Sequence, residues 1–210
     1  YLLGDIAFVP ISVLMVTLVL EHILEKKQKD ALMHKLNMVL GTFFSEVGNP
    51  LIKQLAALQE DNPGLCEKLL IQQKWGSIDF AQKKNFLARF SYTIQAKKID
   101  LVSLCAFLAE KRPFLLSLLE NQNLLEHDKI TDMLWAIFHL TEELIARRNL
   151  LNLTEPDLGH ISLDIKRSYI QLTLLWLDYM QHLKNDYPYL FSLALRTNPF
   201  DPCASADIAK

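Results

Sequence analysis

The sequence has few of the residues that build sheets or interrupt helices. Only 6 of its 210 residues are Gly, and runs of Val, Ile and Thr are scarce beyond the first two dozen residues. Leu dominates a composition that is 50% hydrophobic. Helix formers such as Leu lose little side-chain freedom in a helix, whereas strands favour β-branched and aromatic residues. We therefore expect an all-α fold.

Cysteine and clustered positive charge are also scarce. The 3 Cys residues lie far apart without a C-x-x-C pair, which argues against a structural zinc site of that type and against a disulfide framework. The formal net charge is −2 and the basic residues are dispersed, so we expect no nucleic-acid partner, since contact with a phosphate backbone needs a basic patch. There is no G-x-S-x-G, Walker or G-x-G-x-x-G motif. We accordingly predict no cofactor, and an enzyme is the less favoured interpretation.

The sequence does contain a long apolar start. Residues 6–20 carry no charge, and a lysine-rich cluster follows at residues 25–29. A helix needs about 20 apolar residues to cross a hydrocarbon layer of about 30 Å. We therefore predict a transmembrane anchor over residues 1–27, with residues 1–24 in the membrane. Lysines on its C-terminal side predict a single-pass protein with a cytoplasmic C-terminal domain. A core or partner-binding helix and a signal peptide are the alternatives.

The remainder is expected to form one irregular multi-helix bundle over residues 28–195, followed by a loop and tail over residues 196–210. Apolar periodicity and helix-boundary signals predict helices near residues 30–47, 51–58, 65–70, 78–94, 101–111, 114–119, 128–151, 155–185 and 189–195. Ser77, Asp100 and Thr154 are the predicted N-caps. Gly48 with Asn49-Pro50, and Arg112-Pro113, are predicted to end helices.

The most informative pattern lies on the long helix near the C-terminus. A rotation of about 100° per residue brings a set of polar side chains within about 80° of one another. This candidate polar stripe comprises Asp157, His160, Asp164, Arg167, Asp178 and His182, with Gln171 between them. Apolar stripes that include Ile161 and Leu163 flank it, whereas Lys166, Thr173 and Lys184 lie roughly opposite, as an expected solvent face.

Three interpretations of the polar stripe stay open. It is a second exposed face with ion pairs such as Asp164–Arg167 and Asp178–His182, a buried network that specifies helix register, or a catalytic or metal-binding site. No single interpretation follows from the spacing.

A second polar set lies on one side of the preceding helix: Asp128, Asp132, Trp135, His139, Glu142 and Glu143. His139-x-x-Glu142 reverses the Glu-x-x-His order of helical di-iron bundles, and Glu46 is a further carboxylate that could complete such a site. Because this polar side lies opposite the apolar side, as an ordinary solvent face does, we assign no metal ion from the sequence. Trp75, Trp135 and Trp176 are expected in the core.

Two stretches, Lys35–Gly48 and Tyr187–Asp201, resemble a group of uncharacterised prokaryotic proteins with an N-terminal membrane segment and a helical remainder. The resemblance covers nearly the whole chain and implies a bacterial or archaeal cytoplasmic face. It brings no activity and no catalytic residues with it.

Two functional hypotheses follow. The first is a membrane-tethered interaction, sensory or scaffold module that contacts a protein partner, or itself, through Phe43 and Phe44 or through the polar stripe. The alternative is a membrane-bound enzyme or metal-binding helical bundle that uses the polar stripe together with His139 and Glu142.

Overall fold

A computed structural model describes residues 13–24, 27, 38–56 and 62–207. The chain divides into two compact units, Tyr1–Val39 and Leu40–Lys210. The described parts of both units contain helices, turns and irregular segments but no strand, which confirms the all-α fold class. The predicted boundary after residue 27 falls beside residues 28–37, which lie outside the described part, so the predicted domain division stays a prediction.

The prediction of a single-pass membrane protein is wrong. Among the described residues, no helix combines the length and the apolar character that crossing a membrane requires. The described helical stretch at residues 13–24 covers only about 18 Å at 1.5 Å per residue. Residues 1–12 of the predicted anchor lie outside the described residues.

The second unit contains a series of helices in chain order. They are a π-helix η1 (Phe44–Gly48), α2 (Asn49–Ala56), α3 (Asn62–Leu69), α4 (Ser77–Arg89), a 3-10 turn η2 (Ala96–Lys98), α5 (Leu101–Leu119), α6 (Gln122–Leu125), α7 (Asp128–Ala146), α8 (Glu155–Asp186) and α9 (Pro188–Arg196).

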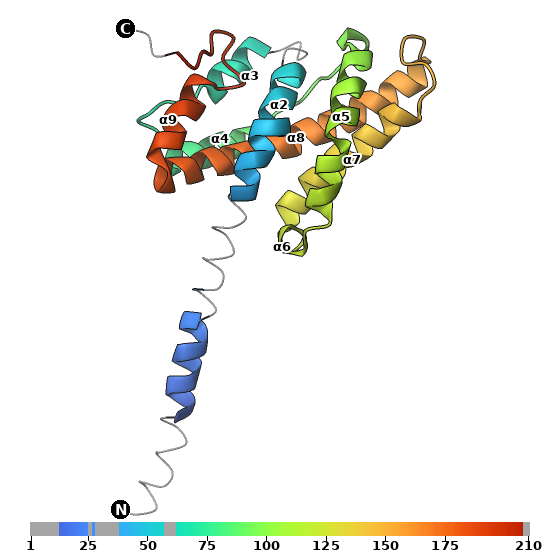
Figure 1. Ribbon diagram of the computed structural model, residues 1–210. Helices are drawn as coiled ribbons and strands as arrows, with labels where there is room; N and C mark the ends of the chain where they lie inside the picture. The colour runs from blue at the N-terminus through green and yellow to red at the C-terminus, as the bar shows by residue number, and fades with distance from the viewer. Residues whose placement is uncertain (1–12, 25–26, 28–37, 57–61, 208–210) are drawn as a thin grey trace, which may run out of the picture. The chain divides into compact units, whose positions relative to one another are not determined.

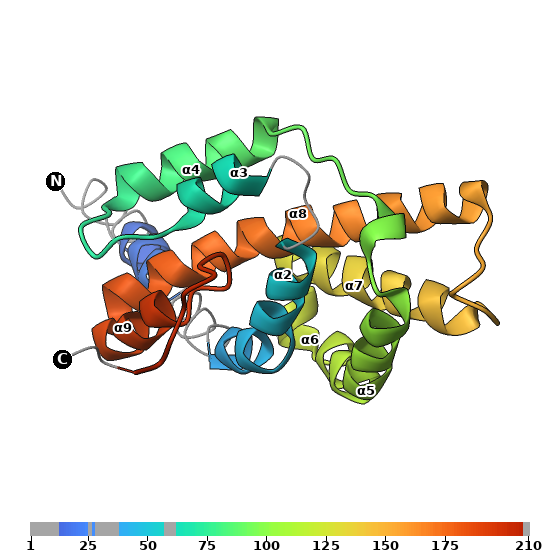
Figure 2. The ribbon, with the colours of Figure 1, turned by 90° about the horizontal axis from the view of Figure 1, so that it is seen from above.

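The long helix α8 is the centre of this unit. Figures 1 and 2 show α4 and α7 lying along different parts of it, and it also contacts η1, α2, η2 and α9. Its largest fully buried side chains are Tyr169 and Trp176. α5 packs on the outer side of α7 and contacts α6. A helix surrounded in this way needs apolar or hydrogen-bonded side chains around most of its circumference.

The predicted solvent face of α8 is therefore wrong in part. Thr173 is fully buried and its hydroxyl donates to the carbonyl of Tyr169 at 2.7 Å. The ammonium of Lys184 donates to the carbonyls of Gln73, at 2.7 Å, and Trp75. Conversely Leu163, predicted on an apolar stripe, is 61% exposed. Neighbouring helices on several sides, which periodicity does not reveal, determine these differences.

Two predicted helix ends are also wrong. Gly48 and Asn49 do not terminate a helix, since the π-helical turn η1 leads directly into α2 and Asn49 has right-handed helical angles. α5 passes through Arg112-Pro113 without a break. Pro113 removes one hydrogen bond to the carbonyl of Ala109, but both residues are exposed, so that water can supply the missing donor.

Helix starts follow the sequence more closely. The carboxylate of Asp100 accepts from Ser103 N at 3.0 Å, and the hydroxyl of Thr154 accepts from Asp157 N at 3.4 Å, which confirms both N-caps. The N-cap of α4 is Gly76 and not Ser77, because Asp79 accepts from Gly76 N at 2.7 Å. α3 begins at Asn62, three residues before the start predicted at residue 65.

Candidate metal centre

α7 and α8 pack as an antiparallel pair joined by residues 147–154. A buried hydrogen bond from the Ser168 hydroxyl of α8 to the backbone carbonyl of Ala136 in α7, at 3.0 Å, joins the helices where both side chains are small. From this point the two helices bring successive pairs of side chains together. These pairs are His139 with Asp164, Glu143 with His160, and Arg147 with Asp157. A continuous polar seam therefore runs along the contact.

Two imidazoles and two carboxylates alternate in a closed ring at the middle of this seam. His139 Nε2 lies 3.6 Å from Asp164 Oδ2, and the same oxygen lies 3.4 Å from His160 Nε2. Glu143 closes the ring, with Oε2 3.5 Å from His160 Nε2 and Oε1 3.9 Å from His139 Nε2. Each helix supplies one imidazole and one carboxylate at positions i and i+4, on the same helical face.

Asp164 is the buried member of this ring. The residue is only 2% exposed, and its Oδ1 accepts from Arg167 Nη1 at 3.1 Å. Its Oδ2 is buried, faces both imidazoles and accepts no hydrogen bond within the described part of the chain. A buried carboxylate oxygen that accepts no hydrogen bond costs free energy, and such a position needs an explanation such as a bound ion.

Arg147 fixes the charge of Glu143. Its Nη1 donates to Glu143 Oε2 at 2.7 Å and to the Glu143 carbonyl at 2.6 Å. This hydrogen bond is the largest cause of a lowered pKa for the Glu143 carboxyl, and the nearby positive charge acts in the same direction. Glu143 is therefore a carboxylate at neutral pH. Arg147 Nη2 also lies 3.6 Å from Asp157, so one guanidinium joins both helices.

Most distances between neighbouring atoms around the ring fit those between two ligands of one metal ion. Bonds of about 2.0–2.2 Å from a tetrahedral ion to N and O ligands place those ligands about 3.3–3.6 Å apart. Three of the four distances around the ring are 3.4–3.6 Å. One ligand atom from each of His139, Glu143 and His160 can be chosen so that all three lie within 4.8 Å of one another. This set of three does not include Asp164.

An open hollow adjoins the ring. It has a volume of about 500 Å³ and is lined by Asp132, Trp135, Ala136, His139, Arg167 and Gln171. His139 belongs to both the ring and the hollow. Trp135, expected in the core, is 54% exposed here, whereas Trp75 and Trp176 are buried as predicted. The α7–α8 contact therefore combines the ring with an accessible space beside it.

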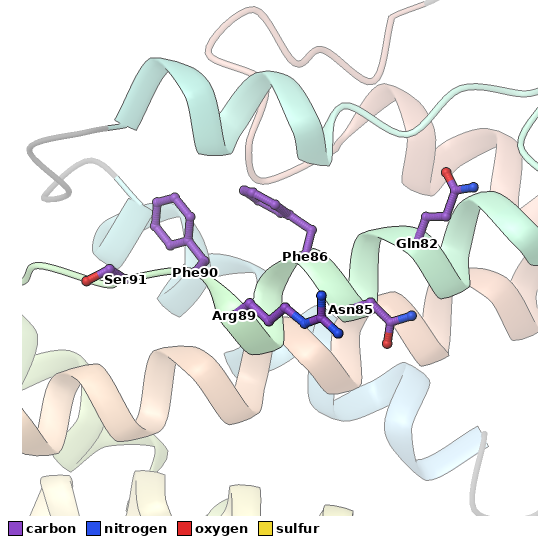
Figure 3. Close-up of a pocket in the computed structure, with 6 residues that line it drawn as sticks. All are labelled: Gln82, Asn85, Phe86, Arg89, Phe90 and Ser91. Atoms are coloured by element: carbon purple, nitrogen blue, oxygen red, sulfur yellow. The ribbon is translucent and has the colours of Figure 1, made fainter.

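A cavity of similar size elsewhere lacks such groups. It has a volume of about 490 Å³ on α4 and is lined by Gln82, Asn85, Phe86, Arg89, Phe90 and Ser91. Figure 3 shows the Phe86 and Phe90 rings directed toward α3, away from Asn85 and Arg89. Lys68 of α3 lies 4.0 Å from the centre of the Phe86 ring. This lining has no imidazole, carboxylate or thiol, so it is the weaker candidate.

The structure brings only part of the predicted set together. Asp157, His160, Asp164, Arg167 and His139 lie along the seam. The other candidates form ion pairs elsewhere: Asp178 with Lys84 (2.6 Å) and Lys129 (3.3 Å), His182 with Asp186 (2.7 Å), Glu142 with Arg112 (2.6 Å) and Glu46 with Lys111 (3.2 Å). The predicted Asp178–His182 pair is thus replaced by separate partners.

Sequence reasoning placed Glu143 in the polar set of α7 but did not choose it as a candidate ligand, and it missed Arg147. The available signal was the spacing His139-x-x-x-Glu143, which matches His160-x-x-x-Asp164. The suggested partner contacts Phe43 and Phe44 are both buried, so they offer no surface to a partner. A protein partner or self-association through other residues stays a prediction.

Comparisons with known proteins agree with a helical family. A family model described as "Uncharacterized protein MJ1433, C-terminal helical domain" matches residues 32–196, and one described as "MJ1433, N-terminal helical domain" matches residues 1–24. The chain is 44% identical over 201 residues to "Uncharacterized protein MJ1433" of Methanocaldococcus jannaschii, a match that covers 96% of this chain and 81% of the relative. No solved structure matches. The resemblance to an uncharacterised helical family is confirmed, without support for its membrane segment.

Proposed function

Because this chain belongs to the MJ1433 C-terminal helical domain family, whose description gives no activity, we propose a function from its own geometry. The protein binds one divalent transition-metal ion between α7 and α8. The ligands are His139, Glu143, His160 and Asp164.

The observation that carries this proposal is the buried oxygen of Asp164. Oδ2 faces both imidazole nitrogens at 3.4 and 3.6 Å and accepts no hydrogen bond among the described residues. An exposed set of ion pairs would not bury a carboxylate in this way, since burial disfavours the charged form. A cation bound by Asp164 and both imidazoles would satisfy this oxygen.

The donor set indicates the class of ion. Imidazole suits Zn²⁺, Fe²⁺, Cu²⁺ and Ni²⁺, whereas Ca²⁺ and Mg²⁺ prefer ligands that are all oxygen. Arg147 donates a hydrogen bond to Glu143 and Arg167 donates one to Asp164, which holds both carboxylates in place. The two guanidinium groups share the carboxylate charge with the bound ion. The side chains of His139 and His160 are about half exposed, so the ion would lie near the surface and within reach of a small ligand.

The test is metal binding by the full chain. The protein is stripped with a chelator, dialysed, and titrated with Zn²⁺ by calorimetry and with Co²⁺ by visible absorption. We expect one equivalent of either ion, and the Co²⁺ spectrum of a four-coordinate nitrogen and oxygen site. The substitutions His139→Ala, His160→Ala and Glu143→Gln each weaken Zn²⁺ binding by tenfold or more, on the order of the loss caused by disturbing a metal's supporting residues.

Matched controls are available within the same chain. Glu142→Gln changes the neighbouring carboxylate, which pairs with Arg112, and His22→Ala removes an imidazole from the other unit. Both controls should bind Zn²⁺ like the unchanged protein. Substoichiometric binding by the unchanged protein, or equal losses for Glu142→Gln and Glu143→Gln, would refute the proposal.

A further inference from the structure

The hollow beside the ring has two chemically different sides. α7 supplies Trp135 and His139, one helical turn apart, and α8 supplies Arg167 and Gln171 with the same spacing. His139 and Arg167 therefore mark the end nearest the metal ligands. Asp132 lies one turn before Trp135, toward the opposite end. Arg167 thus places one positive charge at the end next to the ring, and Asp132 places one negative charge toward the opposite end.

Arg167 is suited to bind an anion at this end. Its side chain is 59% exposed, and its Nη1 donates to Asp164 Oδ1 at 3.1 Å. A guanidinium carries five N–H donors in a planar fork that matches phosphate and carboxylate oxygens. The hydrogen bond to Asp164 fixes the position of Arg167 beside the proposed ion. An oxyanion at this end would thus meet two positive centres.

Trp135 provides an apolar surface in the same space. The edge-to-face contact with Phe138, at 6.1 Å between ring centres, holds the indole in position while more than half of the residue stays exposed. An indole face is a large surface on which planar rings stack. The exposed position of Trp135 is costly for a large apolar side chain, and a ligand that covered it would offset that cost.

We propose that this hollow binds a small planar aromatic compound that carries a phosphate or carboxylate group. The oxyanion lies against the metal ion and Arg167, and the ring stacks on Trp135. This inference rests on the proposed metal site, because it assigns the ligand class of that same site.

The experiment uses the full chain saturated with Zn²⁺, with binding measured by calorimetry. The probes are phenylphosphonate, methylphosphonate and benzoate, which separate the contributions of the ring and of the anionic group. Phenylphosphonate should bind roughly two- to tenfold more tightly than methylphosphonate, as expected for one aromatic contact. Benzoate identifies whether the site prefers a carboxylate to a phosphonate.

The variants assign these differences to residues. Trp135→Ala should bring the ratio of the two phosphonate affinities to about one. Arg167→Gln should weaken both phosphonates by about tenfold to a hundredfold, since a charged hydrogen bond is lost. Arg148→Gln, an exposed arginine outside the lining of the hollow, is the matched control and should change neither. Zn²⁺ binding is measured first for every variant.

The two proposals fail in different ways. If the chain binds one Zn²⁺ but neither phenylphosphonate nor benzoate, the ligand class is wrong and the metal site stands. If both phosphonates bind with equal affinity, or if Trp135→Ala leaves their ratio unchanged, the role of Trp135 is wrong. If no Zn²⁺ binds, the metal site is refuted and this inference falls with it.

Discussion

Replacing Asp164 with Asn separates a ligand-binding role of this buried carboxylate from a stabilising role. In the metal-free protein, one oxygen of Asp164 pairs with Arg167, and the other accepts no hydrogen bond within the described residues. The substitution removes the negative charge and keeps the shape of the side chain. Arg167 is largely exposed, so its charge returns to water and no buried charge is left unpaired.

The expected magnitudes differ clearly between the two roles. For a ligand-binding role, the free energy of unfolding of metal-free Asp164→Asn lies within about 1 kcal/mol of the unchanged protein, or above it, since an unsatisfied buried oxygen is no longer charged. For a purely structural ion pair, breaking a buried pair costs about 3–5 kcal/mol. Zn²⁺ at a hundred times its dissociation constant stabilises a binding protein by about 2.7 kcal/mol. For a chain of this size, this corresponds to a rise in Tm of about 5–11 °C.

Calorimetric melting gives the Tm and the free energy of unfolding of both proteins, each with chelator and with saturating Zn²⁺. We expect the unchanged protein to gain several degrees with Zn²⁺ and Asp164→Asn to gain none. A loss of more than about 3 kcal/mol in the metal-free variant, combined with no effect of Zn²⁺ on the unchanged protein, would refute the reasoning and favour a structural network.

Three further predictions concern the fold. Gly48→Ala should destabilise the protein by about 1–3 kcal/mol in urea unfolding, because the added Cβ would clash with the buried Phe44 ring; an unchanged midpoint would contradict this. Ser168→Ala should cost about 0.5–1.5 kcal/mol through the lost hydrogen bond to Ala136, and equal stability would show that this bond is dispensable. Hydrogen bonds from Ser103 lower the pKa of the Asp100 carboxyl, so this group contributes stability above its unfolded pKa, and the contribution disappears as pH falls through the folded value. Asp100→Asn keeps an N-cap and should flatten the acid limb of stability below about pH 4, whereas an unchanged acid limb would exclude this role.

The polar stripe shows how far helical periodicity reaches. It correctly places His160 and Asp164 on one face of α8, because residues four apart always share a face. On α7, helical periodicity does not tell which of Glu142 and Glu143 faces α8, although the two differ by about 100° around the helix axis. The rotation of α7 against α8, fixed by the close contact of Ser168 and Ala136, directs Glu143 into the seam. Glu142 instead pairs with Arg112 of α5.

Other parts of the stripe depend on more distant helices. Asp178 lies on the same face as Asp164, yet it pairs with Lys84 of α4 and Lys129 at the start of α7. The burial of Thr173 follows in the same way from helices packed on several sides of α8.

The amino-acid sequence by itself determined the all-α class, the N-caps at Asp100 and Thr154, and the two His–carboxylate pairs at positions i and i+4. These are local properties, since helix propensity, capping and spacing act within one helix. Tertiary structure alone decided that the two pairs face each other, that Asp164 is the buried member, and that Trp135 stays exposed beside them. Those outcomes depend on which helices pack together and at what rotation, which no single helix specifies.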